Sequence, residues 1–132
     1  TPIALGESYR THFELQPFFT SKSLDVLQPD LGRSGITESL RIAATAHRQS
    51  IAIVPHVSIA GGPQIAAALH FASMTPACNL VEYNPRVLEI ANRFLTQPIL
   101  MKDAQYVFPE GDGLGIDLFE ISLRSGSCLN TF

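Results

Sequence analysis

Residues 27–38, LQPDLGRSGITE, decide how the rest of the chain is interpreted. They predict the end of a buried strand, a tight glycine-bearing turn and the start of a helix. Asp30 lies where the apolar run of the strand stops. Packing does not explain a carboxylate at this position, because a charged group is costly to bury and a core prefers Val or Ile. The position therefore indicates a helix cap or a functional site.

The same order of strand, turn and helix recurs along the chain. Apolar runs predict strands at 3–5, 24–28, 51–55 and 80–81, and helical periodicity predicts helices at 9–19, 37–48, 64–74 and 85–94. The run at 51–55 is continuous and β-branched, as in a strand covered on both faces. Thr37 is expected to cap the second helix, with Glu38 in its first turn. Two short extended runs, 99–101 and 105–108, follow. The alternation predicts parallel βα units.

Each of the first four predicted strands is followed by an ionisable side chain: Glu7, Asp30, His56 and Glu82. The carboxyl ends of parallel strands meet at one face of a barrel, or at one edge of an open sheet, and ligands bind there. We therefore expect these side chains to lie close together. A carboxylate beside an imidazole fixes the tautomer of the ring and raises its basicity. Asp30 and His56 together predict a general base that works near neutral pH.

Each of these residues also has an interpretation that needs no function. Asp30 could cap the helix that follows it, and His56 could be a histidine with satisfied hydrogen bonds at a strand end. Glu7 could be a surface acid or a metal ligand, and one carboxylate does not hold Mg²⁺ firmly. Glu82 could be an ion-pair partner or, when protonated, a hydrogen-bond donor. The remaining histidines are predicted on helix surfaces or in structural positions: His12, His47 and His70.

Composition limits the classes of protein to which the chain can belong. The 132 residues are 45% hydrophobic and 16% charged, which is enough apolar material for one core. The net charge of −3 and the scattered Lys and Arg argue against a nucleic-acid partner. The apolar stretches are too short to span a membrane, and no signal peptide is predicted. Cys78 and Cys128 make a weak case for a disulfide, so a reduced, cytoplasmic setting is expected.

Five short motifs resemble the C-terminal part of the enolase superfamily, in its mandelate racemase/muconate lactonizing enzyme-like branch. They are PIALGES at 2–8, DVLQPD at 25–30, GITE at 35–38, VPH at 54–56 and GLG at 113–115. Their order and approximate spacing match the family over nearly the whole chain. The resemblance implies an α/β fold, the C-terminal half of a parallel (β/α) barrel of the TIM type. Residues 1–132 would form about four βα units, with 99–132 as the closing loop and tail.

The resemblance also implies a role for each strand-end residue. Glu7 matches a metal ligand at the fifth barrel strand. Asp30 and His56 match an aspartate–histidine dyad at the sixth and seventh strands, with His56 as general base or acid. Glu82 matches the acidic residue of the eighth strand, which binds substrate or stabilises the enolate. The implied chemistry is removal of a proton next to a carboxylate, with Mg²⁺ holding the resulting enediolate.

What the resemblance implies about activity is a Mg²⁺-dependent enzyme acting on a small hydroxy acid or sugar acid. An acid-sugar dehydratase is expected first, and a racemase or epimerase is the alternative. The N-terminal capping domain and the first four barrel strands have no counterpart here, so the metal site is expected to be incomplete. Unclosed strands leave open edges and an uncovered inner face. We therefore expect part of a longer enzyme or a homo-oligomer, with a non-catalytic half-barrel as the alternative of another class.

Overall fold

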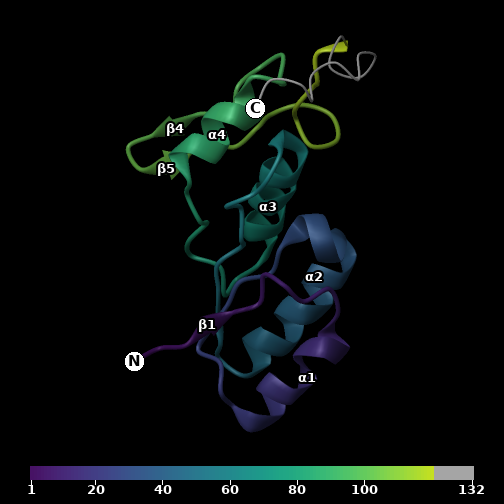
Figure 1. The fold of residues 1–132 in the computed structure, drawn as a ribbon, viewed down its shortest axis with the longest axis vertical. Helices are drawn as coiled ribbons and strands as arrows, with labels where there is room; N and C mark the ends of the chain where they lie inside the picture. Colours follow the sequence, from purple (N-terminus) through teal and green to yellow (C-terminus); the bar gives the residue numbers. More distant parts are fainter. Residues whose placement is uncertain (121–132) are drawn as a thin grey trace.

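The computed structural model describes residues 1–120, in which helices cover a small parallel sheet (Figure 1). The strands β1 (Ala4–Leu5), β2 (Val26–Leu27) and β3 (Ala52–Ile53) lie in that order in the sheet. Both pairings are parallel, and a helix connects each pair of strands. The predicted parallel βα units are confirmed.

The two faces of this sheet differ in burial. One register row belongs to the core shared with the helices: Leu5, Leu27 and Ile53. The neighbouring row is exposed or half-buried: Ala4, Val26 and Ala52. Such alternation is expected where only one face of a sheet is covered. The prediction that 51–55 is covered on both faces is therefore wrong for the described residues, and the uncovered face expected of an unclosed barrel is present.

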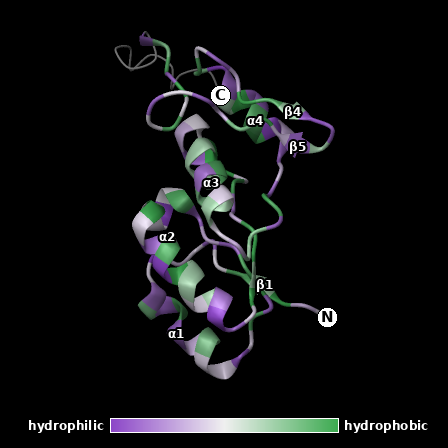
Figure 2. Cartoon of the chain, turned by 180° about the vertical axis from the view of Figure 1, so that it is seen from behind, coloured by the Kyte–Doolittle hydropathy of each residue, from purple (hydrophilic) through white to green (hydrophobic). Residues whose placement is uncertain are grey.

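Three helices follow the three strands: α1 (His12–Ser21), α2 (Leu31–Arg48) and α3 (Gly62–Met74). α1 begins with a capping box, in which Thr11 Oγ1 accepts from the Glu14 N–H and the Glu14 carboxylate accepts from the Thr11 N–H. α1 also contains Pro17 in its interior. Figure 2 shows hydrophilic and hydrophobic residues side by side on α1 and α2, as expected of helices with one buried side.

The start of α2 differs from the prediction. Asp30 caps this helix, which begins at Leu31, so Thr37 is not its cap. Gly35, at φ 69° and ψ 168°, interrupts the helix after its first turn. Thr37, the predicted cap, therefore lies just after the break at Gly35. The helix itself begins directly after Asp30, one of the four predicted site residues.

The strand predicted at 80–81 does not form among the described residues. The Ile53 N–H donates to the Ala77 carbonyl, and the Glu82 N–H donates to the Pro55 carbonyl at 3.4 Å. Pro55 has no N–H of its own, so the hydrogen-bond ladder between these two contacts lacks a donor. Leu80 is 68% exposed in this stretch. The segment therefore follows β3 only at its two ends, yet it still returns Glu82 to the sheet edge.

The C-terminal part of the described chain lies at the end of the molecule opposite α1 (Figure 1). It consists of α4 (Pro85–Asn92) and a hairpin of β4 (Met101–Lys102) and β5 (Gln105–Tyr106), close to the two predicted extended runs. Asp103 and Ala104 have φ values of 51° and 60°, which suit a two-residue hairpin turn. Cys78 donates to the Leu80 carbonyl. Cys128 and the rest of 121–132 lie outside the described residues.

Among residues 1–120, the core joins the sheet to the helices α1 to α4. It includes Leu27 and Ile53 of the sheet, Phe19 of α1, Ile42 of α2 and Phe71 of α3, each at most 2% exposed. Small residues on α3 let it pack closely: Ala66 and Ala68 are fully buried. Within residues 1–120, we find no helix with the length and apolar character needed to cross a bilayer.

Candidate active site

Asp30 and His56 lie side by side where β2 and β3 end. Backbone hydrogen bonds continue the parallel pairing past both strands, from the Val54 N–H to the Leu27 carbonyl and from the His56 N–H to the Pro29 carbonyl. Asp30 and His56 form the last bridge of this pairing. In-register neighbours on parallel strands present their side chains on the same face. The parallel pairing therefore brings together two side chains that lie far apart in the sequence.

Asp30 both caps α2 and binds His56. The residue is 2% exposed, and its Oδ1 accepts from the Arg33 N–H at 3.1 Å and from Gln64 Nε2 at 3.0 Å. Its Oδ2 lies 3.0 Å from His56 Nδ1. A buried carboxylate needs such partners, because unpaired charge is costly to bury. Asp30 therefore caps the helix, as its position before α2 suggests, and also pairs with His56, as predicted from the strand ends.

The second ring nitrogen of His56 faces two other carboxylates. Nε2 lies 3.7 Å from a Glu7 oxygen and 4.0 Å from a Glu82 oxygen. With Asp30 accepting at Nδ1, the neutral ring carries its proton there and has its lone pair at Nε2. The four residues predicted from the strand ends are thus brought together, with Nε2 of His56 facing the two glutamates.

Glu7 is held at the end of β1 by the tight turn before it. Gly6 has φ 144°, and a Cβ at this position would lie 2.8 Å from the Gln28 backbone nitrogen. Only glycine tolerates both this conformation and this approach. The Glu7 side chain is 57% exposed, so its carboxylate is open to a ligand from solvent.

Glu82 is a hydrogen-bond acceptor in this structure. Its Oε2 accepts from the Val57 N–H at 2.7 Å, and its Oε1 accepts from the Ser58 hydroxyl. The Tyr106 hydroxyl donates to the Glu82 backbone carbonyl at 3.1 Å, which ties the hairpin to the site. Burial raises the pKa of Tyr106 to about 12, with Tyr83 and Glu82 adding to the effect, so this hydroxyl keeps its proton at neutral pH.

Gln64, Ser58 and Tyr106 support the site and were not predicted from the sequence. Ser58 lies two residues after His56, so the position of a hydroxyl next to a strand-end histidine could have drawn attention to it. Gln64 and Tyr106 come from α3 and β5, and no spacing in the sequence indicates their contacts.

The donor set around Glu7 matches part of a Mg²⁺ site. Mg²⁺ prefers carboxylate oxygens and retains several waters, and Glu7 offers an exposed carboxylate. Glu82 has both oxygens occupied by donors, and Asp30 is buried under three. Across the described chain no group of three or more His, Cys, Asp or Glu residues is arranged so that it could hold a metal ion. The described residues therefore offer one exposed carboxylate here and not a complete metal site.

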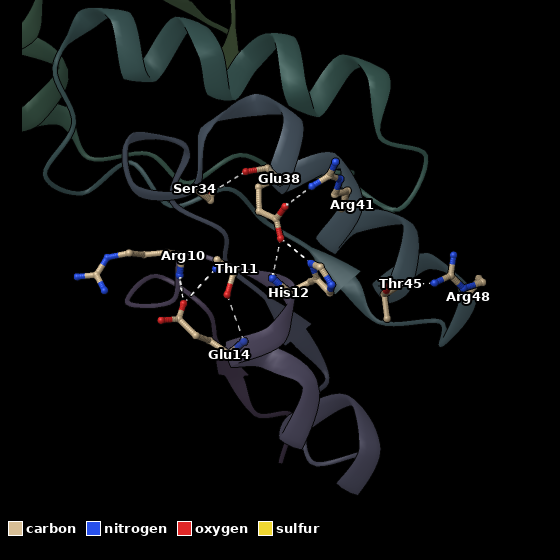
Figure 3. Close-up of polar contacts among 10 residues, drawn as sticks. Arg10, Thr11, His12, Glu14, Ser34, Glu38, Arg41, Thr45 and Arg48 are labelled. Carbon is tan, nitrogen blue, oxygen red and sulfur yellow. Dashed lines mark hydrogen bonds and ion pairs between the residues drawn. The ribbon is translucent and has the colours of Figure 1, made fainter.

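His12 and His70 lie in other polar contacts, and His47 is exposed on α2. Figure 3 shows that the Glu38 carboxylate of α2 contacts His12, at the start of α1, and Arg41, on the same helix as Glu38. The His12 N–H and its ring nitrogen lie 2.8 and 2.7 Å from one Glu38 oxygen. These hydrogen bonds, the backbone one first, lower the pKa of Glu38 to about 2. His70 Nε2 lies 3.2 Å from the Leu114 carbonyl, consistent with a structural role.

Comparison with known protein families establishes the family of this chain. A family model described as enolase C-terminal domain-like matches residues 1–122. The chain belongs to the enolase C-terminal domain-like family. The resemblance of the motifs to the enolase superfamily is confirmed by this match.

Individual relatives in the enolase superfamily cover nearly all of the chain. D-galactarolactone cycloisomerase of Agrobacterium fabrum is 37% identical over 128 residues, which are 89% of this chain. D-galactonate dehydratase of Ralstonia nicotianae is 32% identical over 127 residues, 90% of the chain. The chain spans 33% of the length of each. A crystal structure of an enolase superfamily member from Agrobacterium tumefaciens aligns with a TM-score of 0.86 at 31% identity, covering 93% of this chain and 32% of that one. The predicted barrel-type fold class is confirmed by this alignment.

Proposed function

We propose that this chain supplies the general base and one metal ligand of an enzyme that removes the α-proton of a hydroxy-carboxylate, best matched by an acid-sugar dehydratase. The observation that carries the proposal is the 3.0 Å contact between Asp30 Oδ2 and His56 Nδ1, with His56 Nε2 directed toward Glu7 and Glu82. Relatives named D-galactonate dehydratase support the substrate class.

His56 is the proposed proton-transfer residue. Asp30 accepts the Nδ1–H and thereby keeps the lone pair on Nε2, which can take a proton from a substrate carbon. Asp30 also stabilises the imidazolium that forms, because its buried carboxylate carries the compensating charge. In a dehydratase, the same His56 can return the proton to the departing β-hydroxyl, so that water leaves and a keto acid results.

Glu7 is the proposed metal ligand. Members of the enolase superfamily generally use Mg²⁺, and the exposed Glu7 carboxylate offers a suitable oxygen. When bound, Mg²⁺ supplies positive charge beside the developing anion of the substrate. Further ligands would have to come from outside the described residues. Glu82, with its oxygens held by Val57 and Ser58, is proposed to orient the substrate beside His56 Nε2.

An isomerase is the second candidate. The relative named D-galactarolactone cycloisomerase, at 37% identity, favours it over a racemase on this comparison. Both reactions use the same proton abstraction, so the residues proposed here serve either. A non-catalytic half-barrel remains the alternative of a different class, in which the four residues have no chemical task.

One experiment separates these functions. The complete gene product is incubated with D-galactonate and Mg²⁺ in D₂O, and NMR follows the α-proton signal together with the appearance of a keto acid. Keto-acid formation supports the dehydratase, and exchange without water loss supports the isomerase. His56→Ala should reduce the rate by roughly 10²–10⁴-fold. His47→Ala on α2 is the matched control and should leave the rate unchanged. A rate that His56→Ala does not alter would contradict the proposal.

A further inference from the structure

Gln64 contacts the Asp30–His56 pair from outside the strand ends. It lies in the first turn of α3 and is half-buried. Its Nε2 is 3.0 Å from Asp30 Oδ1, the oxygen that does not bind His56. A carboxylate oxygen accepts only, so the amide must present its N–H side to Asp30. The contact therefore fixes the orientation of the Gln64 amide as well as that of the carboxylate.

Gly32 provides the space in which this amide lies. A Cβ at position 32 would come within 2.3 Å of Gln64 Oε1 and 2.7 Å of Gln64 Cδ, and it would lie 3.2 Å from Asp30 Oδ1. Contacts below 3.0 Å require atoms to shift. Gly32 lies in the first turn of α2, next to Arg33, whose N–H donates to Asp30. The Gln64 amide can lie this close to α2 because glycine has no side chain.

We propose that Gln64 is a positioning residue for the Asp30–His56 pair and that Gly32 makes this contact possible. The Arg33 N–H and the Gln64 amide occupy Oδ1, which leaves Oδ2 for His56 Nδ1. Two donors on Oδ1 hold the plane of the carboxylate, and the hydrogen bond between Oδ2 and Nδ1 then orients the imidazole with Nε2 toward Glu7 and Glu82. The importance of this for catalysis rests on the proposed function, but the geometry itself can be tested independently.

A purely structural role for Gln64 makes a different prediction. If the amide only links α3 to α2, its removal lowers stability and leaves the His56 ring as it was. If the amide positions Asp30, its removal also loosens the Nδ1–H hydrogen bond. The decisive readout is therefore spectroscopic and belongs to the His56 ring.

The first experiment compares Gln64→Leu with the unaltered protein, both labelled with ¹⁵N-histidine, at one fixed pH. The ring nitrogen shifts report the tautomer of His56, and the proton on Nδ1 reports its hydrogen bond. We expect a single Nδ1–H tautomer in the unaltered protein. In Gln64→Leu we expect roughly tenfold faster exchange of this proton, the change that corresponds to about one lost hydrogen bond. Gln16→Leu, at an exposed position on α1, is the matched control.

The second experiment tests Gly32 through a double-mutant cycle. Alanine normally stabilises a helix relative to glycine. Here we expect Gly32→Ala alone to lower the melting temperature by roughly 2–5 °C and to speed exchange of the His56 proton, because its Cβ displaces the Gln64 amide. In a Gln64→Ala background the space is vacated, and Gly32→Ala should then raise the melting temperature.

The outcomes distinguish this inference from the proposed function. An unchanged His56 signal in Gln64→Leu, or a Gly32→Ala effect with the same sign in both backgrounds, would overturn the positioning role even if His56→Ala abolishes activity. Conversely, a loosened His56 proton in a protein without α-proton exchange would support the positioning role while the proposed function fails.

Discussion

Replacing Asp30 with Asn and with Ala separates its two tasks. Asn is as good a helix cap as Asp, and its side-chain oxygen can still accept from Arg33 and Gln64. Ala removes the cap and both of these contacts. Neither variant can accept the Nδ1–H of His56 through a carboxylate. The structure therefore predicts similar losses of activity but different losses of stability.

The magnitudes follow from the three hydrogen bonds of Asp30. Losing the cap costs about 1 kcal/mol. Leaving a buried donor unpaired costs about 1–3 kcal/mol, which applies to His56 Nδ1 in Asp30→Ala; the half-buried Gln64 amide can bond to water instead and adds little. We expect Asp30→Ala to lower the free energy of unfolding by about 2–4 kcal/mol. Asp30→Asn, which keeps the cap, should lose about 1 kcal/mol through the His56 contact alone.

Urea denaturation measures the stability of both variants, and α-proton exchange in D₂O measures their activity. We expect an activity loss on the order of 10⁴-fold for Asp30→Asn, the size seen when an isosteric amide replaces the aspartate of a catalytic triad. Equal destabilisation by the two variants would refute the assignment of the cap to Asp30. Near-normal exchange in Asp30→Asn would refute the role of its charge on His56.

Four further predictions rest on other features. Because the pKa of Glu38 falls from its ordinary 4.5 to about 2 on folding, its contribution to stability is complete above pH 4.5 and is lost as the pH falls toward 2. Glu38→Gln should therefore flatten the stability profile across that window in acid denaturation. Gly6→Ala should cost about 1–3 kcal/mol in urea denaturation, since a Cβ would meet the Gln28 backbone at positive φ; an unchanged midpoint would show that the turn relaxes freely. EDTA should abolish α-proton exchange in the complete gene product and Mg²⁺ should restore it, with Glu7→Gln needing more Mg²⁺ for half-maximal rate; activity in EDTA would argue against a metal. Light scattering on residues 1–132 should give a mass above that of one chain, because the apolar face of Ala4, Val26 and Ala52 is uncovered; a clean monomer would contradict self-association.

Much of the site could be predicted because its signals are local. A charged residue directly after an apolar strand stands out in the sequence, and parallel pairing then brings such residues together without further information. The contact between Asp30 and His56 could be predicted from the positions at which two strands end. Glu7 and Glu82 were found in the same way, although the strand expected before Glu82 did not form.

The failures have a different origin, because they depend on what other elements supply. The strand at 80–81 was predicted from two apolar residues, but its partner Pro55 cannot donate to it. The start of α2 was missed because Gly35, with its positive φ, interrupts the helix after the turn that Asp30 caps, and a second set of helix-start signals begins at Thr37. Gln64 was missed because its contact requires an empty position at Gly32, far away in the chain.

The double use of Asp30 affects how sequences related to this one should be compared. A lineage that lost the chemistry would still be selected to keep an acid or amide at this position, because the second helix depends on it for folding. Glu7 is exposed, has no such second task in the described structure and would be free to drift. His56 also partners the buried Asp30 carboxylate and would drift less freely. An intact aspartate alone is therefore poor evidence of activity in a relative, whereas joint retention of the histidine and the glutamate is informative.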